Sequence, residues 1–453
     1  METGLNKSNI TDGDSNNKNC SYCNKPFTEK LWCKECDPFR IIEGWTSGNP
    51  NVDKFIKDTM YDIKIHSNRF FEWIPFDKFT DIKEIGRGGF SKVYSATRID
   101  GKSFYYKDND GNYRKEVHGP EKVALRRLNG SQNMSDKYLS ELKLHWNLFK
   151  AYGIKPYGLT KDPETKEFIM IMELANESLR NTISSNFNNI LWSDKLKILY
   201  EILTDLRRLH ELGYFHKDIH SGNILKFRGL FDEDIMYYIS DFGLCGPSNE
   251  QKSDGKVYGV LPYIAPEVLS GKPYTTSSDI YSIGILMTEL SSGKLPFYNK
   301  KHDLNLALEI CDGLRPEFGK GTPEIYRKLA YNCMNAHPKE RPTAKDLEWI
   351  FYFWSSSGDR TEHSGHKKKE IQVAFEEADK EIPNISTSYE KDSDAVYTSR
   401  AFAFSNSLPE PSNSYFLTAH INNRENDFDP YLDDKEINLL FESILKQDKH
   451  DNE

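Results

Sequence analysis

The stretch Tyr214–Leu225, which reads YFHKDIHSGNIL, determines how the rest of the chain is interpreted. It places Asp218 and Asn223 five residues apart in a short polar segment. An apolar helical pattern ends near Leu212 before this segment, and the strand-like run 223–225 follows it. Because both ends of such a loop are fixed, the two side chains can converge on one point. An Asp there can accept a proton from a hydroxyl while the Asn carbonyl oxygen binds a metal ion, the combination that phosphoryl transfer requires.

Other motifs surround this loop in an order that argues against a chance pairing of Asp and Asn. The glycine-rich run IGRGGFSKV lies upstream at 85–93, and DFG at 241–243 and APE at 265–267 follow downstream. Together these motifs resemble those of protein kinases, and the resemblance covers residues 79–352. It implies an α+β, two-lobed fold with a small β-rich N-terminal lobe and a large helical C-terminal lobe. It also implies transfer of the γ-phosphate of ATP to a protein hydroxyl.

The resemblance assigns roles to individual residues. Asp218 is expected to be the catalytic base, and Asn223 and Asp241 are expected to bind Mg²⁺. Glycines in the glycine-rich run let the backbone approach phosphate oxygens with no Cβ in the way, and its amides can donate to them. The residues expected to bind ATP lie in that run, around the adenine and at the hinge: Ile85, Gly86, Gly88, Gly89, Val93, Ala124, Met172, Glu173, Ala175 and Leu225.

The chain departs from the family at the lysine that contacts the α- and β-phosphates. The strand VALR ends in Arg126, and Glu141 on the next helix is expected to pair with it. A second alignment gives that role to Lys107, but Tyr105 would then replace the small residue beneath the adenine. Lys107 also lies 34 residues before Glu141, whereas Arg126 lies 15 before it, which leaves room for a short loop and the start of a helix. We therefore predict that Arg126 contacts the phosphates and that activity is weak.

Other positions of the resemblance are structural. Glu267 and Arg341 are expected to form a buried ion pair, and Asp279 is expected to anchor the backbone of the catalytic loop. Lys217 stands where the family has Arg, and His220 where serine/threonine kinases commonly have Lys. The patterns HKDIHSGNIL and GVLPYIAPEVL are most similar to the tyrosine-kinase-like group expanded in fungi, with Ser or Thr favoured over Tyr as the acceptor.

Composition restricts the setting in which the chain works. A net charge of −9 argues against a nucleic-acid or membrane-surface binder. The sequence has neither an apolar run of membrane-spanning length nor a basic N-terminal segment followed by an apolar core. A soluble, cytoplasmic protein is therefore expected. A hydrophobic content of 37% indicates that part of the chain does not pack.

The N-terminal segment has three predicted parts. Residues 1–17 are expected to be disordered, and 41–78 are expected to be a linker that contains a helix. Residues 18–40 carry two CxxC pairs, which can supply four thiolates to one Zn²⁺ in a ribbon-like segment. Four unligated thiols are the alternative. The cysteines are Cys20, Cys23, Cys33 and Cys36.

Residues 353–453 are predicted to be a largely disordered tail, since Ser, Asn, Asp, Glu and Lys dominate them. A possible helix at 435–446 has one apolar stripe, which either docks on a partner or has no role. Two other functions stay open. Arg126 favours a pseudokinase scaffold that binds nucleotide or partners without phosphoryl transfer, and the cysteines alone would suit a zinc-dependent adaptor.

Overall fold

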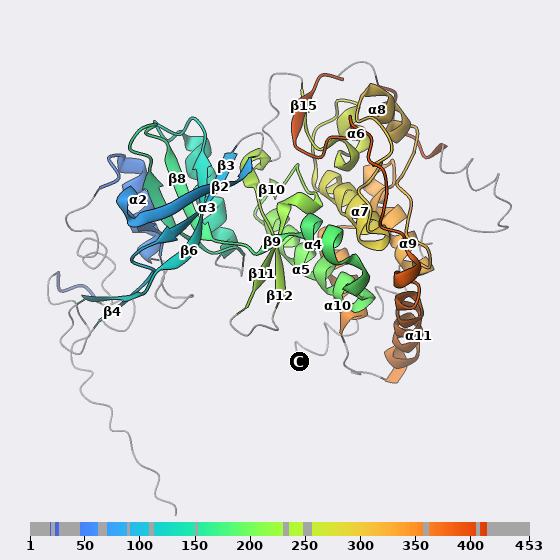
Figure 1. Ribbon diagram of the computed structural model, residues 1–453, viewed down its shortest axis with the longest axis horizontal. Coiled ribbons are helices and arrows are strands. Elements are labelled where there is room, and N and C mark those ends of the chain that lie inside the picture. Colours follow the sequence, from blue (N-terminus) through green and yellow to red (C-terminus); the bar gives the residue numbers. More distant parts are fainter. Residues whose placement is uncertain are drawn as a thin grey trace, which may run out of the picture. The chain divides into compact units, whose positions relative to one another are not determined.

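The computed structural model describes residues 19, 23–26, 46–61, 70–87, 91–107, 113–149, 153–229, 235–247, 256–356, 362–404 and 408–414. The chain divides into two compact units (Figure 1). The first, which we call the sheet lobe, comprises Met1–Glu84, Tyr94–Trp146 and Pro156–Met172. The second, the helical lobe, comprises Ile85–Val93, Asn147–Lys155 and Glu173–Glu453. This is the two-lobed arrangement that the sequence predicted.

The sheet lobe is built on a six-stranded sheet with the strand order β1-β7-β8-β6-β3-β2. Val123 and Leu125 alternate along β6 and pack with Ile169 and Ile171 of β8 in its hydrophobic core. The remaining two strands, β4 and β5, form a separate antiparallel hairpin. The strands are β1 (Glu72–Trp73), β2 (Phe79–Arg87), β3 (Ser91–Arg98), β4 (Lys102–Lys107), β5 (Tyr113–His118), β6 (Glu121–Leu128), β7 (Pro156–Lys161) and β8 (Phe168–Glu173).

Among the described residues of the sheet lobe, aromatic side chains join two α-helices. Phe71 is fully buried, with its ring centroid 5.2 Å from that of Phe55 and 6.3 Å from that of Trp146. Edge-to-face contacts at these distances are the favoured geometry for aromatic pairs. The helices are α2 (Pro50–Tyr61), in the segment where the sequence predicts one, and α3 (Asp136–Phe149), with a short 3-10 helix η1 (Phe76–Lys78) between them.

The helical lobe is organised around α5 (Trp192–Glu211). Leu196, Leu199 and Leu203 recur at helical spacing on α5 and are fully or almost fully buried. The other α-helices of this part of the chain are α4 (Leu179–Asn186), α6 (Pro266–Leu269), α7 (Thr276–Ser292), α8 (Leu304–Cys311), α9 (Glu324–Cys333) and α10 (Ala344–Ser355). The short strands are β9 (Glu177–Ser178), β10 (Tyr214–Phe215), β11 (Ile224–Arg228), β12 (Ile235–Ile239), β13 (Gly246–Pro247) and β14 (Val257–Gly259).

The tail differs from its prediction over residues 362–404, which form α11 (Glu362–Asp379), η7 (Ile382–Asn384) and β15 (Arg400–Phe402). On α11 the buried Phe375 lies 5.5 Å from Trp192 and 5.6 Å from Trp354, between ring centroids. The Asp379 carboxylate accepts from the Trp192 backbone N–H, at 2.7 Å. The tail has too few apolar residues for a core of its own, but those few extend the core of the helical lobe. The expected helix at 435–446 lies outside the described residues.

The predicted zinc segment lies mostly outside the described residues, as do residues 1–17. Only Cys23 of its four cysteines is described, in a short turn where Asn19 and Pro26 form an isolated bridge. Within the described ranges no group of three or more His, Cys, Asp or Glu side chains could hold a metal ion. In the same ranges no helix is long and apolar enough to cross a membrane.

Candidate active site

The backbone of the polar loop after β10 is held by one buried carboxylate on α7. Asp279 accepts from the backbone N–H groups of His216 and Lys217, each at 2.9 Å, and from His210 Nε2 at 2.9 Å. Burial by itself would raise the pKa of Asp279, but these donors hold it below its usual value. Asp279 therefore has the anchoring position expected for it. Lys217 adopts a left-handed conformation with φ 69°, so the chain turns sharply just before Asp218.

Asp218 and Asn223 converge, as the spacing predicted. The Asn223 side-chain amide donates to the Asp218 carbonyl at 2.9 Å and to its Oδ2 at 3.4 Å. Asp218 is 7% exposed, and this burial raises the pKa of its carboxyl to about 7. A hydrogen bond from Ser399 opposes that rise, and the charge of Asp241 adds to it. Asp218 Oδ1 is buried and has no hydrogen-bond partner among the described residues.

The segment that carries Asp241 is bonded to the same loop. Ser240 donates its N–H to the Asn223 carbonyl at 2.8 Å, and His216 Nε2 lies 3.0 Å from the Ser240 carbonyl. Asp241 has φ 62°, a left-handed conformation, and its side chain accepts from Gly243 N–H at 3.4 Å. Since the Asn223 amide nitrogen faces Asp218, its Oδ1 remains for a cation. This oxygen and the Asp241 carboxylate are ligands that Mg²⁺ prefers, so the residues present fit the implied ion.

His220 is a neutral side chain in the position where Lys is common. Gly222 N–H lies 3.1 Å and Arg180 Nη2 3.3 Å from His220 Nδ1, which makes this nitrogen an acceptor. The ring proton therefore sits on Nε2, 3.8 Å from Asp218 Oδ2. Burial, reinforced by the charge of Arg180, lowers the pKa of His220 well below its usual value.

A buried polar network supports the loop from below, and sequence reasoning missed it. Ser221 Oγ donates to Glu289 at 2.7 Å, and Tyr263 donates to the other Glu289 oxygen at 2.5 Å. Arg180 reaches Ser221 at 3.3 Å. Burial raises the pKa of Glu289, which the charge of Arg180 partly offsets. These residues come from four distant parts of the chain, so no local pattern could reveal the network.

Arg126 and Glu141 form an ion pair within the sheet lobe. Arg126 Nη1 donates to Glu141 Oε1, and the two side chains are 7% and 8% exposed. Arg126 lies on β6, which stands between β8 and β3 in the central sheet. Lys107 lies instead on β4, in the separate hairpin. The expected pair is therefore present, and Arg126 lies in the central sheet whereas Lys107 does not.

The other expected ATP-binding residues occupy strands and their ends. Ala124 lies on the same face of β6 as Arg126, opposite the core residues Val123 and Leu125. Met172 is buried near the end of β8. The chain passes from the sheet lobe to the helical lobe between Met172 and Glu173.

The glycine-rich run is described only in part, because Gly88 and Gly89 lie outside the described residues. Ile85 is exposed on β2. A Cβ on Gly86 would lie 3.9 Å from the Val93 Cβ, in ordinary contact. The two ends of the run therefore lie close together.

The helical lobe contains Glu173 and Ala175, which were expected at the hinge. Glu173 N–H donates to the Lys155 carbonyl at 2.9 Å, and their side chains form an ion pair at 3.2 Å. Leu225, the expected floor beneath the adenine, lies on β11 and is paired with Ser178 of β9.

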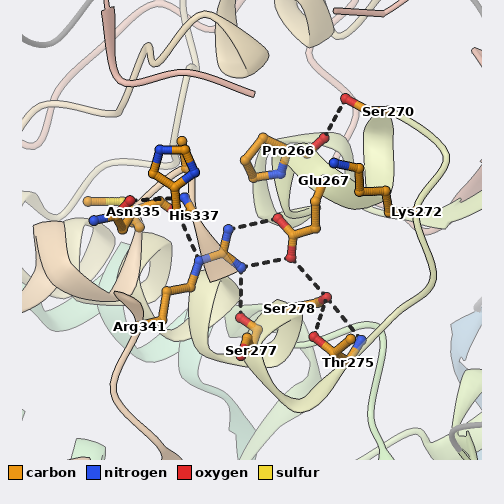
Figure 2. A network of polar contacts seen from close by, with 12 residues as sticks. Pro266, Glu267, Ser270, Lys272, Thr275, Ser277, Ser278, Asn335, His337 and Arg341 are labelled. Atoms are coloured by element: carbon orange, nitrogen blue, oxygen red, sulfur yellow. Dashed lines mark hydrogen bonds and ion pairs between the residues drawn. The ribbon is translucent and has the colours of Figure 1, made fainter. Parts of the chain in front are cut away.

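The ion pair expected between Glu267 and Arg341 is present and bidentate. Arg341 Nη1 and Nη2 donate to the two Glu267 oxygens at 2.8 and 2.7 Å, as Figure 2 shows. Arg341 also donates to the Ser277 carbonyl at 2.9 Å, and Ser278 donates to Glu267 at 3.1 Å. The Arg341 side chain is completely buried. The pair therefore fixes the segment after β14 to the helices beneath it.

The protein kinase domain family matches residues 79–353, about three fifths of the sequence. The chain belongs to the protein kinase family. Within this kinase domain, the motif residues of the catalytic loop, the DFG segment and the APE segment have the contacts described above.

Several kinases share this domain at low identity. A probable serine/threonine-protein kinase of Dictyostelium discoideum is 28% identical over 204 residues, 45% of this chain and 12% of the relative. A G-type lectin S-receptor-like serine/threonine-protein kinase of Arabidopsis thaliana is 26% identical over 332 residues, 66% of this chain and 37% of the relative. A second Dictyostelium kinase is 28% identical over 287 residues, with coverages of 60% and 39%. The chain spans less than half the length of each relative.

One contact of the kinase domain has no counterpart in the sequence predictions. The hydroxyl of Ser399 donates a hydrogen bond to Oδ2 of Asp218, the expected catalytic base. Ser399 lies 181 residues further along the chain, beyond the matched domain. A serine in a polar tail carries no local signal of such a position.

Proposed function

We propose that this protein is an ATP-dependent kinase that phosphorylates Ser or Thr hydroxyls of proteins. The observation that carries the proposal is the geometry of Asp218. Its carboxylate is buried beside the Asn223 amide, on a loop anchored by Asp279, and a hydroxyl already donates to it. The relatives named as serine/threonine kinases support the choice of acceptor.

Each residue of the catalytic loop has a separate task in this proposal. Asp218 orients the acceptor hydroxyl and takes its proton. Asn223 and Asp241 would hold Mg²⁺, which neutralises charge on the phosphates when it is bound. Arg126 would contact the phosphates from β6 while Glu141 holds its guanidinium. The planar Arg126 guanidinium, which makes bidentate contacts, replaces the compact ammonium of the family's lysine, so we expect slow turnover.

Phosphoryl transfer from labelled ATP by the purified full chain tests the proposal. The acceptors are the chain itself and a mixed library of Ser, Thr and Tyr peptides, with Asp218→Asn as the matched control. We expect Ser and Thr peptides to be labelled by the native protein and not by the variant. Thermal shifts with ATP should be larger with Mg²⁺ than without it. Absence of transfer to any acceptor, at any Mg²⁺ concentration, would contradict the proposal.

A scaffold without phosphoryl transfer is the second candidate function. Two observations favour it: Arg126 replaces the phosphate lysine, and the neutral His220 replaces a common cationic position. On this alternative, ATP stabilises the chain or has no effect, and neither acceptor is labelled. The transfer assay therefore separates the two functions.

Other sequence predictions are carried forward as proposals. We infer membership of the tyrosine-kinase-like group, a cytoplasmic location and one Zn²⁺ held by the two CxxC pairs. Metal analysis of the full chain after purification without chelators tests the zinc proposal. About one equivalent that is lost on replacing Cys33 and Cys36 with Ser supports it, and a metal-free protein rejects it.

A further inference from the structure

The tail segment 395–402 ends in β15, which adds a strand to β14. β15 pairs antiparallel with β14, with Phe402 opposite Val257 and Arg400 opposite Gly259 (β15 is labelled in Figure 1). An extended peptide that adds a strand to an exposed edge is bound through its main chain and is read through alternate side chains. The tail therefore occupies the edge of β14 as a bound peptide would.

The register of this pairing brings Ser399 to the catalytic base. Gly259 has φ 139°, and a Cβ there would lie 3.2 Å from Ile264 Cγ1 and 3.5 Å from Asp218 Oδ1. Its positive φ and the close Ile264 side chain favour glycine at this position, which lies within van der Waals distance of Asp218. Because Arg400 is the partner of Gly259, the residue before it, Ser399, reaches Asp218 and donates to its Oδ2.

Contacts on the N-terminal side of Ser399 hold the segment in place. Tyr397 is 6% exposed, and its hydroxyl donates to the Pro296 carbonyl at 2.8 Å. Arg180 Nη1 donates to the Tyr397 carbonyl at 3.0 Å. His302 Nδ1 donates to the carbonyl of the preceding residue, Val396, at 2.9 Å. The segment is therefore bound by side chains as well as by strand pairing.

Burial on both sides of Ser399 specifies which hydroxyl faces the base. Tyr397 and Phe402 are buried, whereas Thr398 and Ala401 are exposed. A slip of one residue would move both buried side chains toward more exposed positions, which disfavours a one-residue shift of this register. Thr398, the neighbouring hydroxyl, is therefore a matched control.

We propose that Ser399 is the acceptor of an intramolecular phosphoryl transfer, and that residues 395–402 block the protein-substrate site until that transfer occurs. This proposal rests on the kinase activity proposed above. Ser399 Oγ forms a bond to the γ-phosphorus of ATP, and the bond from that phosphorus to the bridging oxygen breaks, leaving its electron pair on ADP. The hydroxyl proton moves to Asp218.

Phosphorylation of Ser399 is expected to release residues 395–402 from the site. Phosphoserine adds a charge of about −1.5 to −2 at neutral pH. It would stand beside the Asp218 carboxyl, which is already influenced by the charge of Asp241. Like charges at this distance repel, so phosphorylation of Ser399 weakens the hold on residues 395–402 and opens the site to other proteins.

Mass spectrometry of the full chain incubated with Mg²⁺ and ATP tests the inference. Four proteins are compared: the native chain, Ser399→Ala, Thr398→Ala and Tyr397→Ala, each with the peptide library as a second acceptor. We expect Ser399 to approach one phosphate per chain, with a half-time unchanged over a hundredfold dilution. Thr398→Ala should behave as the native chain. Tyr397→Ala removes the side chain that anchors the segment, so Ser399 is no longer held at Asp218. This variant should therefore label Ser399 about a hundredfold more slowly than the native chain, and it should label library peptides faster.

The outcomes separate this inference from the proposed function. Library peptides labelled while Ser399 stays unmodified overturn the inference and leave the kinase activity intact. A rate at Ser399 that rises in proportion to protein concentration, or labelling of an added Asp218→Asn chain, shows transfer between molecules and also overturns it. No transfer to either acceptor rejects both. Slower labelling of library peptides by Tyr397→Ala, at an unchanged melting temperature, contradicts the block.

Discussion

Replacement of Arg126 with Lys is expected to raise the rate of phosphoryl transfer. Arg126 is fixed by its buried ion pair with Glu141, so its guanidinium cannot adjust freely to a phosphate. Its planar fork is longer and bulkier than an ammonium, and a misplacement of about 1 Å costs roughly a hundredfold in rate. That factor corresponds to about 2.7 kcal/mol of barrier. We therefore expect Arg126→Lys to be faster by about one to two orders of magnitude, with nucleotide binding changed less than turnover.

Steady-state transfer to library peptides, together with the dissociation constant for ATP, measures this effect. Tyr397→Ala is the background, so that the tail does not limit access. Lys107→Ala on the β4–β5 hairpin is the control and should be nearly silent. Glu141→Gln tests the ion pair, since removal of one partner leaves a buried charge uncompensated at a cost of roughly 3–5 kcal/mol. Loss of transfer in Lys107→Ala, with transfer retained in Arg126→Ala, would instead assign the phosphate contact to Lys107.

Three further predictions concern the helical lobe. Arg341→Ala leaves the buried Glu267 carboxylate without its partner and should lower the free energy of unfolding, measured in denaturant, by roughly 3–5 kcal/mol. Arg341→Lys keeps the positive charge and should lower it by less. Burial raises the pKa of Asp205 to about 7 from an unfolded value of 3.8. The stability from that group is therefore full below pH 4 and falls by about 1.4 kcal/mol between pH 6 and 8. The free energy of unfolding of Asp205→Asn should therefore fall by about 1.4 kcal/mol less than that of the native chain over this range. Phe375→Ala should cost roughly 3 kcal/mol and speed hydrogen exchange in α11, whereas the exposed Glu376→Ala should do neither.

The sequence predicted those parts of the site whose residues are close together along the chain. Asp218 and Asn223 lie in one loop, so their spacing was sufficient to predict that their side chains converge. Arg126 was chosen over Lys107 because a strand and the next helix must lie within a limited length of chain, and the ion pair expected between Arg126 and Glu141 is present. The family assignment followed from motif order, which needs no knowledge of packing.

The parts that the sequence did not predict depend on contacts between distant segments. Composition described the tail as a chain without a core, which is correct for the segment in isolation. It cannot show that Phe375 joins a core made by Trp192 and Trp354. Nor can it show that Ser399 reaches Asp218, because the register is set by β14 and by burial of Tyr397, both distant in sequence.

The arginine at position 126 and the position of Ser399 are consistent with each other, because slow catalysis is sufficient for an acceptor that is already held at the catalytic base. If the Arg126 guanidinium is poorly placed, phosphoryl transfer is slow, and a separate protein substrate must in addition diffuse to the site and bind there. An acceptor already held at the base avoids that cost, because well-oriented intramolecular groups react as if present at effective concentrations of about 10⁵ M or more. A hundredfold loss of rate from the misplaced Arg126 is small compared with that gain in effective concentration. Slow chemistry therefore suffices for Ser399, and a free protein substrate gains access only after residues 395–402 have left β14.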